Sequence, residues 1–482
     1  MWAWLPAPSH EEAELSATFV PLIEESVLRK VLAAALATGA RFAEVFAERR
    51  FSRSVRLEDR RVEELSGGID LGAGVRVVWG ESSAYAYTNR LDLEGLLEAA
   101  RVARAGVHEG SPLEVCDLTE AHPPVKHPVR LAPEDVPQSD MVEVCRRADE
   151  AARAVDPAVS QVLVGVGDSR QRILIANSEG LLVHEDRVRT RLTCHVVAVK
   201  DGEFRTGGEG PGAACGFELF DSHPPEKVGR LAAERAVAML PARPAPAGEM
   251  TVVLAAGGGG VLFHEACGHG LEADLVAKQA SVYGGRLGER IASPLLNGVD
   301  DATDVNAWGS FGFDDEGTPA QRTVLFSNGE LGGYLSDRLR ARELAIQASG
   351  NGRRQSYAHL PIPRMTNTYI LPGDSDPQEI IRQTAKGLYA KGLGGGEVNP
   401  ATGDFVFGVD EGYMIENGEL TYPVRGANLV GNGPTVLAAV DAVGSDFDTR
   451  QGMCGKDGQG APVAFGTPTL RIARITVGGT GA

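Results

Sequence analysis

Apolar and polar positions follow the same order twice in the first half of the chain. A helical spacing of apolar residues leads into short stretches of apolar and polar alternation, and a second helical spacing closes each round. Helices are expected near 22–38, 91–105, 141–155 and 225–240. Strands are expected at 42–47, 54–57, 72–79, 83–88, 161–166, 172–177, 181–189 and 192–200. The pattern predicts two α+β units with antiparallel sheets, at 1–105 and 139–240, joined by a proline- and charge-rich connecting segment at 106–138.

A proline- and alanine-rich stretch at 241–248 divides the chain, because such a sequence stays extended and separates modules. After it, glycine is frequent and short alternating stretches dominate. Asn328-Gly329 and Asn417-Gly418 lie between apolar alternations, where this dipeptide favours a tight hairpin turn. We therefore expect an α+β fold in which a β-rich domain at 249–482 follows the amino-terminal units. Near its start this domain carries a helix with the pattern H-E-x-x-x-H.

The net charge of the chain limits the kinds of partner that it can bind. The 482 residues include 47 Lys and Arg against 65 Asp and Glu, which gives a net charge of −18. No basic tract offsets this acidity, and this argues against general binding to nucleic acid or to anionic membranes. No stretch approaches the roughly 18 apolar residues of a membrane span.

The cysteines and the amino-terminal residues predict a cytoplasmic location for the protein. The amino terminus carries Glu11, Glu12 and Glu14 where a secretory signal would carry basic residues. The cysteines are scattered and include no C-x-x-C pair, which is typical of reduced thiols in a reducing compartment. They lie at positions 116, 145, 194, 215, 267 and 454.

His264, Glu265 and His269 form the H-E-x-x-x-H pattern. Imidazole nitrogens bind zinc well, and a carboxylate that is not a ligand can take a proton from the attacking water. Five residues of a regular α-helix turn the chain by roughly 500°, so the two imidazoles would point about 140° apart. A metal site therefore requires a wide i→i+5 turn or a break at Gly268. The alternative is a buried helix in which one histidine is exposed and the other is hydrogen-bonded.

A catalytic zinc normally has three protein ligands and one open position, so a third ligand is needed. Glu272, three residues after His269, would complete a two-histidine, one-glutamate set. Cys454 lies in a glycine-flanked loop beside Lys456, which would favour the thiolate. Chemistry alone does not choose among the candidates. They are Glu272, Asp274, Cys267, His359 and Cys454.

The second half of the chain resembles the TldD/PmbA family of metalloproteases, and in particular its TldD-like members. The resemblance is carried by ordered segments across about 250–480. These segments are 260–274, 315–319, 351–359, 363–369, 394–396, 416–418, 423–426 and the loop around Cys454.

The resemblance implies that His264, His269 and Cys454 hold zinc and that Glu265 is the general base. The family uses the five-residue spacing of H-E-x-x-x-H, so the spacing is expected. Cys267 departs from the family pattern, since a bulkier aliphatic residue is expected there. A packing role is expected for it, with a soft metal ligand or an oxidation site as alternatives.

These features predict a zinc-dependent peptidase that hydrolyses peptide bonds in unfolded or flexible chains. Glycine-edged strands suit an extended peptide that binds by strand addition. The family context implies a homodimer or a heterodimer with a PmbA/TldE-like subunit. Two alternatives stay open: a regulatory peptide-binding subunit with a structural metal, and a zinc amidohydrolase for non-peptide amides. Candidate oxyanion donors, unranked, are Arg364, Tyr357, His359 and the backbone of 394–396.

Overall fold

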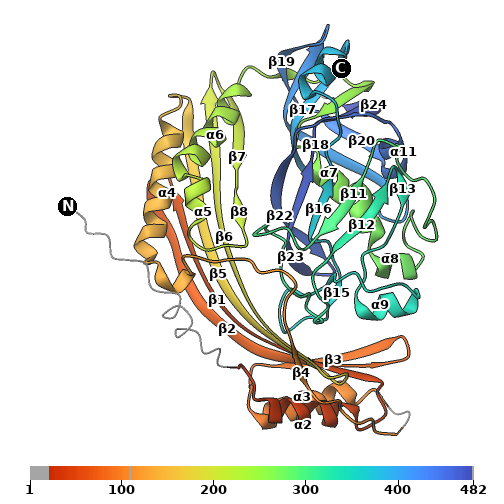
Figure 1. The fold of residues 1–482 in the computed structure, drawn as a ribbon. Coiled ribbons are helices and arrows are strands. Elements are labelled where there is room, and N and C mark those ends of the chain that lie inside the picture. Colours follow the sequence, from red (N-terminus) through yellow and green to blue (C-terminus); the bar gives the residue numbers. More distant parts are fainter. Residues whose placement is uncertain (1–20, 108–110, 480–482) are drawn as a thin grey trace.

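The computed structural model describes residues 21–107 and 111–479. A long curved sheet with helices on its outer side stands beside a β-rich body formed by the second half of the chain (Figure 1). The acidic residues at 11, 12 and 14 lie outside the described residues. Within the described part, no helix is long and apolar enough to cross a membrane.

The amino-terminal sheet has eight strands, and its main path runs in the order β3-β2-β1-β5-β6-β4. The expected short strands at 42–47 and 54–57 belong to one strand, β1, because residues 48–53 between them continue the antiparallel pairing with both neighbouring strands. Since β1 pairs with β5, the two predicted α+β units contribute to one sheet. The strands are β1 (Phe42–Glu58), β2 (Arg61–Trp79), β3 (Ser82–Thr88), β4 (Thr119–Ala121), β5 (Val159–Asn177), β6 (Leu181–Lys200), β7 (Glu203–Glu209) and β8 (Gly212–Ala213).

Two pairs of helices cover the two ends of one face of this sheet. Along β1, Val45 packs with the helices at one end and Val55 with those at the other. Phe46 points to the opposite face, where it meets Phe313 of the C-terminal domain. The first pair is α2 (Glu25–Leu36) and α3 (Leu93–Arg104), and the second is α4 (Gln138–Arg153) and α6 (Pro225–Ala238); the short α5 (Leu219–Ser222) and η1 (Pro133–Asp135) lie in the connections.

The C-terminal domain packs an eight-stranded and a six-stranded sheet around a shared core. The turns at Asn328-Gly329 and Asn417-Gly418 are confirmed as hairpin turns, with positive φ at all four residues. Three strand pairs, β10 with β17, β16 with β23 and β9 with β19, are parallel because long connections return the chain to the same sheet. The eight-stranded sheet contains β9 (Arg243–Pro244), β10 (Gly248–Leu254), β17 (Lys386–Val398), β18 (Asp404–Glu416), β19 (Glu419–Arg425), β20 (Asn428–Asn432), β21 (Val440–Val443) and β24 (Leu470–Gly478). The six-stranded sheet contains β11 (Gly298–Asp301), β12 (Arg322–Ser327), β13 (Glu330–Leu331), β16 (Asn367–Ile370), β22 (Asp448–Lys456) and β23 (Gln459–Thr467).

Short elements complete this domain. They are β14 (Gly352–Arg353), β15 (Ile362–Pro363), α8 (Ala273–Ala277), α9 (Arg338–Glu343), α10 (Pro377–Arg382) and α11 (Gly433–Ala438).

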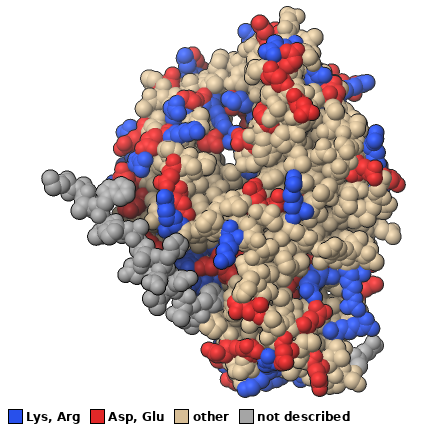
Figure 2. All heavy atoms as spheres, in the orientation of Figure 1, with Lys and Arg blue, Asp and Glu red and all other residues tan. Residues whose placement is uncertain are grey.

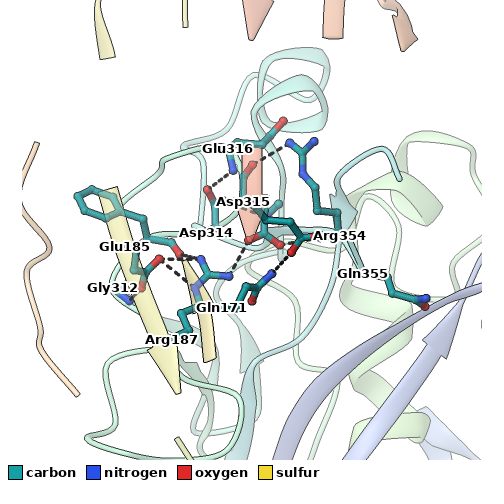
Figure 3. Close-up of polar contacts among 12 residues, drawn as sticks. Gln171, Glu185, Arg187, Gly312, Asp314, Asp315, Glu316, Arg354 and Gln355 are labelled. Carbon is teal, nitrogen blue, oxygen red and sulfur yellow. Dashed lines mark hydrogen bonds and ion pairs between the residues drawn. The ribbon is translucent and has the colours of Figure 1, made fainter. Parts of the chain in front are cut away.

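Buried charges join the amino-terminal sheet to the C-terminal domain (Figure 3). Arg187 of β6 donates through Nη1 to Oδ1 of Asp315 at 2.7 Å. The backbone N–H of Arg354 donates to the other oxygen of Asp315 at 2.8 Å, and the guanidinium of Arg354 reaches Glu44 of β1 at 2.6 Å. Because charge-assisted hydrogen bonds of this kind are strong and directional, they fix the position of the sheet against the domain. The shape of the space between the amino-terminal sheet and the C-terminal domain is therefore fixed by these contacts.

Candidate metal centre

The chain from His264 to His269 departs from a regular α-helix. The helix α7 (Gly260–Phe263) passes into a π-helical turn, η2 (His264–Gly268), and then into a 3-10 turn, η3 (His269–Leu271). The backbone N–H of His269 donates to the carbonyl of His264, five residues earlier. This wide turn confirms the distortion that the spacing requires, and it brings the two imidazole centroids to 5.0 Å from each other.

Gly268 serves close packing rather than a break in the helix. Its φ of −53° is an ordinary helical value. A Cβ atom at this position would lie 2.1 Å from the sulfur of Met365, and a Cβ at Gly433 would lie 2.3 Å from the carbonyl oxygen of Ala266. The π-helical turn is therefore held between two neighbours that leave no room for side chains at these glycines.

His264, His269 and Cys454 place one donor atom each within 4.8 Å of one another. The Sγ atom of Cys454 lies 3.4 Å from Nε2 of His269, close to the edge of about 3.3–3.8 Å in a tetrahedral zinc site. All three side chains are buried. Nδ1 of His264 is buried and has no hydrogen-bond partner among the described residues. Two imidazole nitrogens and a thiol are a donor set that fits zinc.

Arg364 positions the strand that carries Cys454. Its guanidinium is fully buried and donates to the carbonyl oxygens of Cys454 and Gln459, which lie on the paired strands β22 and β23. The resulting hairpin carries residue 454 to the π-helical turn. Arg364 is therefore a buried residue that holds the two strands of this hairpin in place.

The two imidazoles favour the thiolate of Cys454. Burial opposes ionisation of this thiol, but hydrogen bonds and charge from His264 and His269 lower its pKa to about 4. Burial likewise opposes a charge on His269, yet the carboxylate of Glu272 raises the pKa of His269 well above its ordinary value. Lys456, expected to favour the thiolate, turns instead toward two carboxylates.

Glu272 contacts His269 on the ring nitrogen that faces away from the cluster. Oε2 of Glu272 lies 2.9 Å from Nδ1 of His269 and 2.9 Å from Nζ of Lys456. Asp274 accepts from the same ammonium at 2.6 Å. Neither carboxylate belongs to the donor cluster. A carboxylate at this place orients the imidazole of a metal ligand and fixes its tautomer.

The other two ligand candidates lie apart from the cluster. Cys267 donates to the carbonyl of Phe263 at 3.2 Å and packs in the domain core, and burial raises the pKa of its thiol to about 12. These contacts support a packing role. Nδ1 of His359 lies 2.9 Å from the hydroxyl of Ser356.

A cavity of about 780 Å³ opens between the amino-terminal sheet and the C-terminal domain, and His264 and Cys454 of the donor cluster form part of its wall. Figure 2 shows charged side chains of both signs gathered around the hollow between the two halves of the molecule. Glu265 lines the cavity with a partly exposed side chain, and its Oε2 lies 3.7 Å from Nε2 of His269. Among the oxyanion candidates, the structure brings Gly394 and Gly395 to this cavity.

Glycines at 257–260 allow the cavity wall to pass close to its neighbours. A Cβ at Gly258 would lie 2.5 Å from the carbonyl oxygen of Lys391, and one at Gly260 would lie 2.9 Å from the ring of Phe465. This agrees with the expected close backbone approach ahead of the metal helix. Tyr357, by contrast, packs over Gly72 and Gly74 of β2.

Two imidazoles and a thiol within reach of one ion, with a free carboxylate beside them in a cavity, are the parts of a metal-dependent hydrolase. Sequence comparison assigns the family. Residues 247–479 match the PmbA/TldA metallopeptidase C-terminal domain, 131–240 the central domain and 43–106 domain 1. The chain belongs to the PmbA/TldD family of metallopeptidases, which confirms the resemblance seen in its motifs.

Individual relatives carry metalloprotease names. The chain is 40% identical over 433 residues to a metalloprotease TldD homolog of Haemophilus influenzae, covering 88% of this chain and 90% of that protein. It is 27% identical over 445 residues to a zinc metalloprotease TldD homolog of Saccharolobus solfataricus, covering 92% and 97%. These names support a metallopeptidase and imply a metal.

Solved structures share the fold. A protein of Thermotoga maritima described as a modulator of a DNA gyrase superposes with a TM-score of 0.76 at 21% identity, over 94% of this chain and 100% of that one. TldE from Thermococcus kodakarensis superposes with a TM-score of 0.74 at 19% identity, over 94% and 99%.

Proposed function

We propose that this protein is a zinc-dependent peptidase that hydrolyses peptide bonds in unfolded or flexible chains. The observation that carries the proposal is the buried cluster of His264, His269 and Cys454, with Glu265 beside it in the cavity. The metalloprotease names of the relatives support the reaction class, and one of those names specifies zinc.

The protein side chains divide the chemistry among them. Zinc, when bound, supplies a Lewis acid that polarises the scissile carbonyl and makes water more acidic. Glu265 accepts the proton of the attacking water and passes it to the leaving amine nitrogen. Glu272 accepts a hydrogen bond from the Nδ1–H of His269 and so keeps Nε2 free to bind the metal. The backbone N–H groups of Gly394 and Gly395 are the proposed donors to the developing oxyanion.

The edge strands beside the cavity are able to bind an extended peptide. In the described part of the chain, β7 pairs only with β6, and β22 pairs only with β23. Residues of both edge strands line the cavity, so a substrate strand can add to either edge through backbone hydrogen bonds. A folded domain is too large for a cavity of about 780 Å³. The substrate is therefore proposed to enter as an unfolded segment.

The assembly is proposed to be a dimer, either with a second copy of this chain or with a TldE-like subunit. The fold shared with TldE supports the second arrangement, because paired subunits of one fold form closely matched interfaces.

The proposed reaction is tested with purified zinc-loaded protein, alone and with a TldE-like subunit, on casein and on small non-peptide amides. Cleavage of casein that is lost in Glu265→Ala, while zinc is retained, is the expected result. Peptide binding without cleavage of any peptide would favour a regulatory subunit with a structural metal. Turnover of the small amides alone would favour an amidohydrolase.

A further inference from the structure

Among the described residues, four Arg and Lys side chains line the cavity that contains Glu265, and three of them are paired with carboxylates. Arg235 pairs with Glu209 at 2.6 Å, and Arg450 pairs with the same carboxylate at 2.9 Å. Lys391 pairs with Glu411 at 2.7 Å. The fourth is Arg191 of β6.

Arg191 has no carboxylate within 4.0 Å among residues 21–107 and 111–479. Its guanidinium reaches the carbonyl of Gln451 at 3.4 Å, and its Nε is buried without a partner. Burial lowers the pKa of Arg191, since no carboxylate offsets the loss of solvation. A partly buried cation without a counter-ion is costly, and an anion that enters the cavity would remove that cost.

The position of the guanidinium is fixed before any ligand arrives. Its central carbon lies 5.7 Å from the ring centroid of Trp308, whose indole N–H donates to the carbonyl of Gly452 at 3.0 Å. The side chain also crosses Gly212, where a Cβ would lie 3.2 Å from Cγ of Arg191. The planar fork is thus held against a flat aromatic surface, which suits a bidentate contact with a carboxylate.

The distance from Arg191 to the reaction centre follows from β22. Gln451, which Arg191 contacts, precedes Cys454 by three residues on this strand. At about 3.3 Å per residue, this separation is roughly 10 Å, or three residues of an extended peptide.

We infer that Arg191 is a specificity-determining residue that binds a carboxylate of the peptide substrate about three residues from the scissile bond. This inference rests on the proposed function. The carboxylate has two possible sources, an Asp or Glu side chain and the free carboxyl terminus of the peptide. Both present the same planar pair of oxygens to the guanidinium.

Two matched peptide pairs distinguish the sources. One pair has the same sequence with a free carboxyl terminus or a carboxyl-terminal amide. The other pair is amidated and carries Glu or Gln three residues from the cleaved bond. Binding is measured by fluorescence anisotropy in Glu265→Gln protein, so that the affinity is read without turnover. The acidic member of at least one pair should bind about tenfold or more tightly.

Arg191→Gln should abolish this preference, and Arg191→Lys should retain part of it. Lys391→Gln is the matched control, because this cation lines the same cavity but is already paired with Glu411. Its ratio of acidic to amide affinity should stay at the wild-type value. Thermal unfolding of each variant establishes that the fold is intact.

An unchanged ratio in Arg191→Gln, or no preference in either pair with the parent protein, would overturn the inference. Cleavage of these peptides by wild-type protein is scored separately and bears on the proposed function. If no peptide is cleaved, the proposed function fails while the binding ratios still decide the role of Arg191.

Discussion

Nδ1 of His269 lies 2.9 Å from Oε2 of Glu272, a carboxylate that is fully buried and also contacts Lys456. Burial would raise the pKa of Glu272, but His269 and Lys456 lower it to about 2. This contact directs the other ring nitrogen of His269 toward Cys454. We therefore propose that Glu272 acts on the metal site through His269 rather than as a ligand.

Glu272→Gln should weaken zinc binding about 10–100-fold without abolishing it, because the amide no longer fixes the imidazole through a charged acceptor. Zinc affinity is measured by competition with a chromogenic chelator. Asp274→Asn is the control, since Asp274 contacts Lys456 but belongs neither to the donor cluster nor to the contact with His269. Equal zinc affinities for Glu272→Gln and wild type would show that Glu272 does not act on the metal site.

Lys456→Met should lower the free energy of unfolding by about 3 kcal/mol, since it removes the cation that the buried carboxylates of Glu272 and Asp274 share and leaves Glu272 with His269 alone. Urea unfolding of the zinc-free protein measures the loss. Lys278→Gln, at an exposed position shortly after α8, is the matched control and should change stability by less than about 0.5 kcal/mol. A loss no larger than that of the control would contradict a role for Lys456 in the buried network.

Gly268→Ala should destabilise the protein by about 1–3 kcal/mol and reduce its zinc content, because the new methyl group overlaps the sulfur of Met365. Combination with Met365→Ala should recover part of the loss, since the smaller side chain makes room for the methyl group. Unfolding free energies of the two single variants and the double variant form a double-mutant cycle. Strict additivity would show that the two side chains do not compete for space.

Asp337 gives the interface between the two parts of the molecule a defined pH dependence. Burial and the neighbouring carboxylate of Glu316, which pairs with Arg76, raise the pKa of Asp337 to about 7. The folded state therefore binds the proton more tightly than the unfolded state, whose pKa is near 3.9. The stabilisation that comes from protonated Asp337 is complete below the pKa of this group in the unfolded state. It is lost as pH rises through the pKa of the group in the folded state.

The stability advantage of wild type over Asp337→Asn should therefore fall as pH rises from 4 to 7, by up to about 1.4 kcal/mol per pH unit. Urea unfolding across this range measures the difference. Asparagine can replace the capping contact that Asp337 makes with the backbone N–H of Arg340. Asp376→Asn, at the exposed start of α10, controls for the exchange of a capping carboxylate for an amide. A difference that does not change with pH would contradict the shifted pKa.

The sequence predicts local features of this molecule well where the spacing of residues restricts the backbone geometry. The five-residue gap between His264 and His269 requires a distorted helix, and the structure has a π-helical turn there. Asn-Gly dipeptides likewise specify hairpins, because both residues accept positive φ.

The full length of β1 is not visible in the local pattern, because charged residues at 48–53 separate the two apolar alternations. Glu44 lies inside the expected strand 42–47 and Glu48 just after it, and both are buried against the C-terminal domain. Their partners, Arg354 and Tyr357, lie about three hundred positions further along the chain. Periodicity describes only local neighbours, so it cannot show that such charges face a second domain.

The same limit applies around the metal centre. Glu272 is close to His269 in sequence, and its spacing of three residues makes it a candidate ligand. Its pairing with Lys456 depends on the β22–β23 hairpin, which returns from the end of the chain. Arg191 carries no local motif at all, and only the folded arrangement, in which β6 and β22 line the same cavity, shows that no carboxylate of the described residues pairs with it.

We propose that His264, His269 and Cys454 hold zinc while Glu265 performs proton transfer. Zinc content and casein cleavage, measured on the same preparations of wild type, Glu265→Gln and Cys454→Ser, test this division of roles. Glu265→Gln should keep zinc at the wild-type stoichiometry without cleavage, and Cys454→Ser should lose zinc and cleavage together. Cleavage by Glu265→Gln at the wild-type rate, or undiminished zinc in Cys454→Ser, would contradict it.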